Sequence, residues 1–285
     1  MKAALIGLSI SESLTPDMHM AEAKVQGFAY EYLRFDTAVA PFGDKPLSAL
    51  LDMAEAEGFA GVNVTHPFKR DAVALVDELS ESAQLLGAVN TILFKDGQRI
   101  GHNTDYVGFR SALRNGLSGG QVRKVLLLGA GGAGRATAMA LIDQGCQTLC
   151  LFDQSQAATE ELAKQLQAAR PRVSIQCVSE LARFDLRSLD GVVNATPMGM
   201  VDHPGKALDP QDLGPDCWVA DIVYFPRKAE LLRAAEAQQL RTMDGSGMAI
   251  FQAAAAFHLI TGKMASPERM KQSFQNLVSK EQIST

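Results

Sequence analysis

The sequence lacks the features that mark several large classes of protein. Its 285 residues carry 27 lysines and arginines against 32 aspartates and glutamates, with no basic block or aromatic–basic stripe. We therefore expect no nucleic acid partner, because nucleic-acid-binding domains present clustered positive charge. No apolar run approaches the ~20 residues of a membrane-spanning helix, so no membrane partner is expected either.

Cysteine is scarce and shows no motif. The four cysteines, Cys146, Cys150, Cys177 and Cys217, form no C-x-x-C pair. This usage predicts reduced, mostly buried thiols in a cytoplasmic protein. The apolar start MKAALIGLSI breaks after a few residues and has no small-residue cleavage pattern, so it predicts a strand rather than a secretory signal.

What is present indicates a globular α/β protein. The composition is 47% hydrophobic and 21% charged, which is typical of a chain with a sizeable core. Strand-like and helix-like segments alternate through the N-terminal 100 residues and again after residue 120, which predicts two α/β domains. The last two helical segments, 247–261 and 267–280, have no strand between them, and we expect them to return to the first domain.

The stretch Lys124–Gly134, KVLLLGAGGAG, predicts a buried strand, a glycine turn and a helix start. Gly129, Gly131 and Gly134 fit the G-x-G-x-x-G pattern of dinucleotide-binding turns, in which backbone N–H groups approach a pyrophosphate. The alternative is a purely structural glycine turn. The following strand, Thr148–Phe152, ends in Asp153, where an acid that binds a ribose 2′-hydroxyl is expected, and this favours the dinucleotide site.

Ser13 and Thr15 precede a predicted helix and offer two hydroxyls one residue apart. Together they could donate to a carboxylate. The alternative is that Thr15 caps the helix and Ser13 is a loop residue. From these residues alone, the cap is the favoured interpretation.

Lys69 follows a predicted strand end and a turn in the stretch Asn63–Lys69, NVTHPFK. A lysine removed from water at a fixed place can act as an acid or base, whereas most lysines are simply exposed. His66 has no second ligand at suitable spacing, so no metal site is predicted. Asp105 could pair with Lys69 or merely cap the helix that follows it.

Eight motifs together resemble the shikimate/quinate dehydrogenase family. They occur in the family's order over nearly the whole chain, which makes the match specific. The motifs are SLTPDMH (13–19), GVNVTHPFK (61–69), LGAVNT (86–91), GHNTD (101–105), GAGGAG (129–134), NATPMGM (194–200), DIVY (221–224) and DGSGMAIFQA (244–253).

The resemblance implies a fold, an activity and roles for particular residues. The implied fold is an N-terminal βαβ substrate domain (1–105 plus 246–285) and a Rossmann-type dinucleotide-binding domain (106–245), with the active site in the cleft between them. The implied enzyme is an oxidoreductase of aromatic amino acid biosynthesis, in the pathway to chorismate, in which Lys69 and Asp105 are the catalytic pair. The implied substrate residues are Ser13, Thr15, Thr65, Lys69, Asn90, Asp105, Tyr224 and Gln252. The implied cofactor residues are Gly129, Ala130, Gly131, Gly132, Ala133, Gly134, Asp153, Ala195, Thr196, Pro197, Met198, Val223, Gly245 and Met248.

The chain departs from the family pattern at three places. Many members have histidine where this chain has Glu12, whose carboxylate is unexpected beside an anionic substrate unless it points to solvent. The Ser13/Thr15 pair is similar to that of members that accept quinate and prefer NAD. NADP-using members usually carry an arginine just after the second strand of this domain, where the stretch 152–155 of this chain has the acid Asp153 and no arginine. NAD is therefore the expected cofactor and NADP the less favoured one. Arg135 is expected nearer the pyrophosphate than a 2′-phosphate.

Two alternatives to shikimate/quinate oxidation stay open from the sequence. One is an enzyme of the same class that acts on a related substrate, such as an amino-substituted one. The other is a protein that senses NAD or a ligand without turnover, since a fold does not dictate function. We expect a small-molecule partner and either a monomer or a homodimer.

Overall fold

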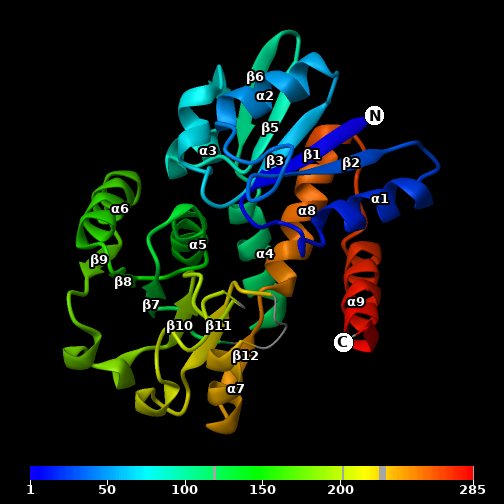
Figure 1. The fold of residues 1–285 in the computed structure, drawn as a ribbon. Helices are drawn as coiled ribbons and strands as arrows, with labels where there is room; N and C mark the ends of the chain where they lie inside the picture. Colours follow the sequence, from blue (N-terminus) through cyan, green and yellow to red (C-terminus); the bar gives the residue numbers. More distant parts are fainter. Residues whose placement is uncertain (118–119, 201, 225–228, 285) are drawn as a thin grey trace. The chain divides into compact units, whose positions relative to one another are not determined.

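The computed structural model describes residues 1–117, 120–200, 202–224 and 229–284, and the chain divides into two compact units (Figure 1). The first unit comprises Met1–Gly108 and Ile250–Thr285, and the second comprises Phe109–Ala249. Helices α4 (Asp105–Gly116) and α8 (Ser246–Thr261) each run from one unit into the other. The predicted α/β class, with a Rossmann-type second unit, is confirmed.

The first unit is built on a mixed sheet with the strand order β2-β1-β3-β5-β6-β4. Strand β1 is parallel to β2 and β3, β5 is antiparallel to β3 and β6, and β4 is parallel to β6. The strands are β1 (Lys2–Gly7), β2 (Glu31–Asp36), β3 (Gly61–Val64), β4 (Glu78–Leu79), β5 (Thr91–Lys95) and β6 (Gln98–His102). The other helices of this unit are α1 (Thr15–Val25), α2 (Leu47–Ala56), α3 (Glu81–Leu86) and α9 (Pro267–Ser284).

Both faces of this sheet are covered, as the alternation along β1 shows. Ala4 and Ile6 pack in one core cluster with Leu50 and Leu51 of α2. Ala3 and Leu5 face the other way and pack with Tyr32 of β2 and Ile260 of α8. Successive residues of a strand point to opposite faces, so an apolar run such as Ala3–Ile6 is expected only where both faces are buried.

Helix α9 packs on α1 and closes the first unit. Glu22 of α1 is buried, and its carboxylate accepts hydrogen bonds from Arg269 Nε at 2.9 Å and from the backbone N–H of Ser266 at 3.1 Å. A buried carboxylate needs such partners to offset the loss of water. The contact fixes the last helix against the N-terminal part of the chain.

The second unit is built on a fully parallel sheet with the order β12-β11-β10-β7-β8-β9. The chain builds β7, β8 and β9 outward on one side, then returns beside β7 and builds β10, β11 and β12 on the other. Ligands of such sheets bind outside the carboxyl ends of the strands at this reversal, here between β7 and β10. The strands are β7 (Lys124–Leu128), β8 (Thr148–Phe152), β9 (Ser174–Cys177), β10 (Gly191–Asn194), β11 (Trp218–Asp221) and β12 (Arg241–Met243), and the helices are α5 (Gly132–Asp143), α6 (Gln156–Ala169) and α7 (Glu230–Ala237).

All four cysteines are free thiols; Cys146, Cys150 and Cys217 are buried and Cys177 is exposed. Among the described residues, no helix combines the length and apolar character that crossing a bilayer requires.

Gly134 allows α5 to pack against the end of β7, and this close approach generates a stability prediction. A Cβ atom at Gly134 would lie 2.1 Å from the carbonyl oxygen of Gly129, which is backbone and cannot move aside cheaply. We expect Gly134→Ala to lower the free energy of unfolding by about 1–3 kcal/mol or more, the usual cost of overpacking. Urea denaturation of the variant and the wild type measures this difference.

Gly131→Ala is the matched control. A Cβ at Gly131 would meet nothing within 4 Å, and its φ of −72° suits any residue. Its free energy of unfolding should stay within ~1 kcal/mol of the wild type. Equal losses in the two variants would contradict the packing argument.

Candidate active site

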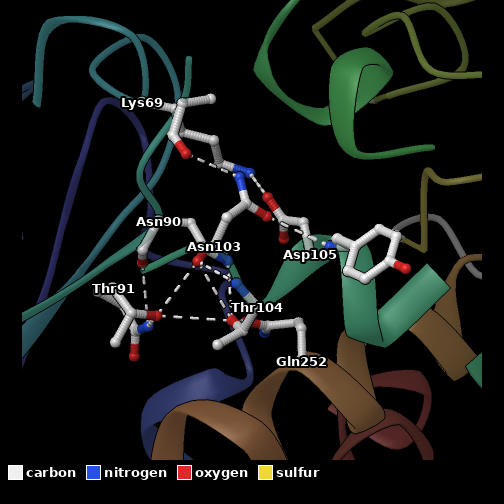
Figure 2. Close-up of polar contacts among 10 residues, drawn as sticks. Lys69, Asn90, Thr91, Asn103, Thr104, Asp105 and Gln252 are labelled. Carbon is white, nitrogen blue, oxygen red and sulfur yellow. Dashed lines mark hydrogen bonds and ion pairs between the residues drawn. The ribbon is translucent and has the colours of Figure 1, made fainter. Parts of the chain in front are cut away.

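Lys69 and Asp105 form an ion pair in the first unit. Lys69 Nζ lies 2.6 Å from Asp105 Oδ2, and the two side chains are only 17% and 6% exposed. Lys69 follows the turn after β3, in which the N–H of Phe68 donates to the carbonyl of Thr65, and its own carbonyl accepts from the N–H of Val89. Asp105 is the first residue of α4. Figure 2 shows the two side chains pointing toward each other. The lysine ammonium is therefore held in one place by a carboxylate with little access to water.

Asp105 is not the residue that caps α4. The backbone N–H of Tyr106 donates to Asn103 Oδ1 at 3.2 Å, and Asn103 Nδ2 donates to the carbonyl of Ala88 at 3.0 Å. Asp105 was expected either to pair with Lys69 or to cap the helix, and in the structure it pairs with Lys69. Asn103 supplies the cap, which the sequence analysis missed.

A network of buried amides and hydroxyls surrounds Asn90 (Figure 2). Asn90 Oδ1 accepts the N–H of Thr104 at 2.7 Å and the Thr91 hydroxyl at 3.2 Å, while Asn90 Nδ2 donates to the Thr104 hydroxyl at 3.0 Å. The Thr104 hydroxyl also lies 3.4 Å from Gln252 Oε1, which reaches it from α8. The structure thus brings the predicted residues Asn90 and Gln252 together through Thr104.

Asn63 extends this network through the sheet. It lies in the middle of the four buried residues of β3, GVNV. Its Nδ2 donates to the Thr91 hydroxyl at 2.8 Å, and its Oδ1 accepts from the Tyr32 hydroxyl at 2.6 Å. Asn63 and Thr104 lie in motifs that were quoted from the sequence, but neither was given a role there. An asparagine inside an apolar strand is a signal that could have found Asn63, because a buried amide must find partners.

The Ser13 and Thr15 hydroxyls have no hydrogen-bond partner within the described parts of the chain. The expectation that Thr15 caps the helix is wrong, because the cap position belongs to Leu14 and no side chain caps it. Leu14 already has helical φ and ψ, so Thr15 lies inside the first turn, where its hydroxyl no longer faces the free N–H groups. The two hydroxyls are available to a ligand. Glu12, beside them, is exposed.

Thr65 and His66 follow β3 on the way to Lys69. Thr65 is partly buried, and its methyl group occupies the space where a Cβ at Gly7 would lie. The Thr65 hydroxyl has no hydrogen-bond partner among the described residues, so it is available to a ligand. The side chain of His66 is exposed. Within the part of the chain that the structure describes, no three histidine, cysteine, aspartate or glutamate side chains cluster as a metal site would require.

The glycine turn of the second unit has the geometry that a dinucleotide needs. It joins β7 to α5 at the carboxyl end of the sheet, and Gly131 occupies the N-cap of α5 with no side chain to satisfy the free N–H groups. Gly129 has a φ of +101°, which only glycine adopts readily. The open Cβ side of Gly131 and the uncapped helix N-terminus fit a pyrophosphate. Gly132 and Ala133 form the first helical turn.

Asp153 lies directly after β8 and faces this turn. Its Oδ2 accepts the backbone N–H of Ala130 at 2.8 Å, and its Oδ1 accepts the N–H of Ser155 at 2.9 Å. Each carboxylate oxygen can accept further bonds, so the residue can hold ribose hydroxyls as well. Asp153 therefore also fixes the conformation of the glycine turn through the N–H of Ala130. Its distance from the glycines in the sequence did not predict this contact.

The Arg135 guanidinium is bound by two side chains of α6. Arg135 is 2% exposed, its Nη2 pairs with Glu161 at 2.9 Å, and its Nη1 donates to Gln165. The expectation that Arg135 lies nearer the pyrophosphate than a 2′-phosphate stays a prediction, but these contacts give the guanidinium a structural role as well.

The remaining predicted cofactor residues lie in loops at the carboxyl ends of β10, β11 and β12. Gly245 packs against the carbonyl of Ile222, since a Cβ there would lie 2.2 Å from that oxygen. The loop after β10 contains Ala195, Thr196, Pro197 and Met198; Val223 follows β11, Gly245 follows β12, and the buried Met248 lies in α8. Tyr224, predicted to contact substrate, is partly buried and belongs to the second unit.

Asn194 and Asp221 hold these loops together. Asn194 Nδ2 donates to Asp221 Oδ1 at 3.0 Å and to the carbonyl of Met198 at 2.9 Å. Asp221 Oδ1 also accepts the N–H of Val223 at 2.9 Å. Asp221 is 1% exposed, and its Oδ2 is a buried atom without a partner in the described residues. Burial raises the pKa of Asp221 to about 7, although the bonds from Val223 and Asn194 oppose this shift.

Known proteins resemble this chain over nearly its whole length. The family model of the shikimate dehydrogenase substrate binding domain matches residues 5–92. Quinate/shikimate dehydrogenase (NAD(+)) of Corynebacterium efficiens is 44% identical over 96% of this chain and 97% of that protein. Shikimate dehydrogenase (NADP(+)) of Pseudarthrobacter chlorophenolicus is 42% identical over 98% and 96% of the two chains. The solved structure of quinate dehydrogenase from Corynebacterium glutamicum in complex with NAD has a TM-score of 0.90 and 42% identity, covering 97% of this chain and 99% of that one.

The raised pKa of Asp221 predicts a pH-dependent stability difference. In the unfolded chain this acid loses its proton near pH 4, whereas in the folded protein it keeps the proton to about pH 7. The folded state therefore binds the extra proton between these values, and its stability falls as the pH rises through that window. Asp221→Asn should gain stability relative to the wild type, by on the order of 2–4 kcal/mol, between pH 5 and pH 8.

Urea denaturation of both proteins at several pH values measures this gain. Any constant cost of placing an amide at residue 221 cancels in the pH dependence. A stability difference that does not change with pH would contradict the assignment.

Proposed function

The chain belongs to the shikimate/quinate dehydrogenase family, and we propose that it catalyses the reversible NAD-linked oxidation of one ring hydroxyl of a shikimate- or quinate-type polyol carboxylate. The observation that carries the proposal is the Lys69–Asp105 pair, 2.6 Å apart and little exposed, at the edge of a buried polar network. A protein that only sensed a ligand would not need an oriented lysine. The intact pair favours catalysis over sensing.

The residues that the family resemblance indicated are the proposed substrate contacts. The Ser13 and Thr15 hydroxyls can donate to the substrate carboxylate. The ring hydroxyls would be held by Thr65, Lys69, Asn90, Asp105, Tyr224 and Gln252. The amides of Asn90 and Gln252 are already oriented by the Thr104 hydroxyl, so little ordering is required when the substrate binds.

Lys69 would perform the proton transfer. In reduction the Lys69 ammonium gives a proton to the carbonyl oxygen as the carbon gains a hydride. In oxidation Lys69 first loses a proton to solvent, and the neutral amine then takes the proton of the reacting hydroxyl as the carbon becomes a ketone. Asp105 keeps Nζ in place throughout. The bound dinucleotide supplies the hydride acceptor or donor. The glycine turn 129–134, Asp153 and the loops after β10, β11 and β12 would hold it.

A second substrate class remains a candidate because of Glu12. Its exposed carboxylate directly precedes Ser13, where it could pair with an ammonium group. NAD reduction with shikimate, quinate and an amino-substituted analogue of each decides between the classes. The proposal fails if none of the four reduces NAD.

Lys69→Met tests the catalytic assignment. We expect kcat to fall by roughly 10²–10⁴-fold, the usual share of acid–base catalysis, while the affinity for NAD stays unchanged. Lys24→Met, which removes an exposed lysine of α1 in the same unit, is the control and should retain full activity. Near-normal turnover of Lys69→Met would rule out Lys69 as the acid–base residue.

Asp153→Asn tests the cofactor preference. We propose that the Asp153 carboxylate accepts bonds from the NAD ribose and repels a 2′-phosphate. Asparagine removes the charge and keeps an oxygen for one of the two N–H groups, that of Ala130 or that of Ser155, whereas alanine would leave both without this partner. The ratio of kcat/KM for NAD to that for NADP should fall about tenfold or more. A ratio that stays constant while both activities fall would mean that Asp153 only shapes the turn.

A further inference from the structure

The loop that carries Ser13 is held by two side chains of β2, and the first is Asp36. Asp36 ends β2, and its carboxylate accepts the N–H groups of Ser9, Ile10 and Ala38, each at 2.9 Å. Ser9 has a φ of 55°, in the left-handed region that is unfavourable for any residue except glycine. The Asp36 carboxylate therefore stabilises a loop conformation that the free chain would rarely adopt.

Arg34 holds the other end of the loop. It lies two residues before Asp36, so both side chains leave β2 on the same face. Its Nη2 donates to the backbone carbonyl of Ser13 at 2.8 Å and pairs with Asp17 Oδ2 at 2.6 Å. The N–H of Ser13 donates to the carbonyl of Ile10 at 3.1 Å. Both backbone groups of Ser13 are thus fixed, and its hydroxyl is left for a ligand.

The Arg34 guanidinium is not fully satisfied by these contacts. Its side chain is 31% exposed, but Nε is buried and has no hydrogen-bond partner in the described residues. The buried Nε cannot reach a ligand, but a partly exposed positive group that bonds to the residue carrying one hydroxyl of the pair attracts an anion through its charge. The Ser13 and Thr15 hydroxyls can bond to a carboxylate but bring no charge, so the charge must come from a neighbour.

Resting on the function proposed above, we propose that Arg34 is a specificity-determining residue: it positions the Ser13/Thr15 hydroxyl pair and gives that pair its preference for a carboxylate over a neutral group. The Asp17 carboxylate, paired with Arg34, partly neutralises the charge of the guanidinium. Removing Arg34 and removing Asp17 should therefore have opposite effects on carboxylate binding, although each breaks the same ion pair.

The test compares the polyol acid with its methyl ester, which keeps the ring hydroxyls and loses the charge. Calorimetry gives the dissociation constants of shikimate and methyl shikimate without turnover, and steady-state assays give KM and kcat. In Arg34→Met the preference for the acid over the ester should fall about tenfold or more, with KM for the acid raised far more than kcat is lowered. Arg34→Lys should recover part of the preference, because it keeps the charge but not the planar fork.

Two further variants separate this role from a structural one. Asp17→Asn should bind the acid as tightly as the wild type or more tightly. Arg99→Met removes another strand arginine, which pairs with Asp52 and Glu55 in the same unit, and should leave the preference unchanged.

If Arg34→Met and Asp17→Asn weaken acid and ester alike, the ion pair is merely structural and the inference is wrong. Wild-type protein that binds shikimate but oxidises none of the four candidate substrates would overturn the proposed function alone. An unchanged acid preference in Arg34→Met would overturn the inference alone. Wild-type protein that binds neither acid nor ester would overturn both.

Discussion

The Lys69–Asp105 ion pair is the interaction on which the arrangement of the polar interior of the first unit depends. Two charges that are 17% and 6% exposed have lost most of their water, and their mutual attraction offsets this loss only if the geometry is good. Good geometry requires that the turn after β3 and the start of α4 be fixed relative to each other. The register of the sheet provides this, since Asn63 of β3 lies opposite Thr91 of β5, and Thr91 lies opposite His102 of β6. Asp105 follows His102 by three residues.

The buried amides and hydroxyls around this register lock it further. Tyr32, Asn63 and Thr91 form a chain of hydrogen bonds of 2.6 and 2.8 Å across β2, β3 and β5. Every member has an oriented partner, and a buried polar group that lost one would cost roughly 1–3 kcal/mol. Such a network stabilises one arrangement over others and so holds the ends of three strands still. Lys69 lies in the turn that follows one of them, β3.

The sequence predicted the parts of this architecture that depend on local pattern. The apolar run Val125–Leu128 and the glycines after it follow from short-range rules. What could not be predicted depends on partners distant in the chain. Arg135 follows the glycine turn in the sequence, yet its guanidinium is bound by Glu161 and Gln165 of α6. Thr15 was predicted to cap α1, but Leu14 occupies the N-cap position, so Thr15 is the first residue inside the helix. Arg34 and Asp36 carry no motif, and only the pairing of β2 with β1 brings them under the Ser13 loop.

The distribution of charge separates binding from catalysis in this site. The chain has a net charge of −5, and two cations among the proposed site residues are each paired with a carboxylate, Lys69 with Asp105 and Arg34 with Asp17. Long-range attraction of an anionic substrate is therefore weak, and discrimination arises at contact. The alcohol and the ketone of this reaction carry the same carboxylate, so contacts with Ser13 and Thr15 stabilise the two ground states and the transition state about equally. Uniform binding of this kind lowers KM without raising kcat. In the proposed mechanism Lys69 exchanges a proton with the substrate, so its interaction changes during the reaction and is the one expected to contribute to kcat.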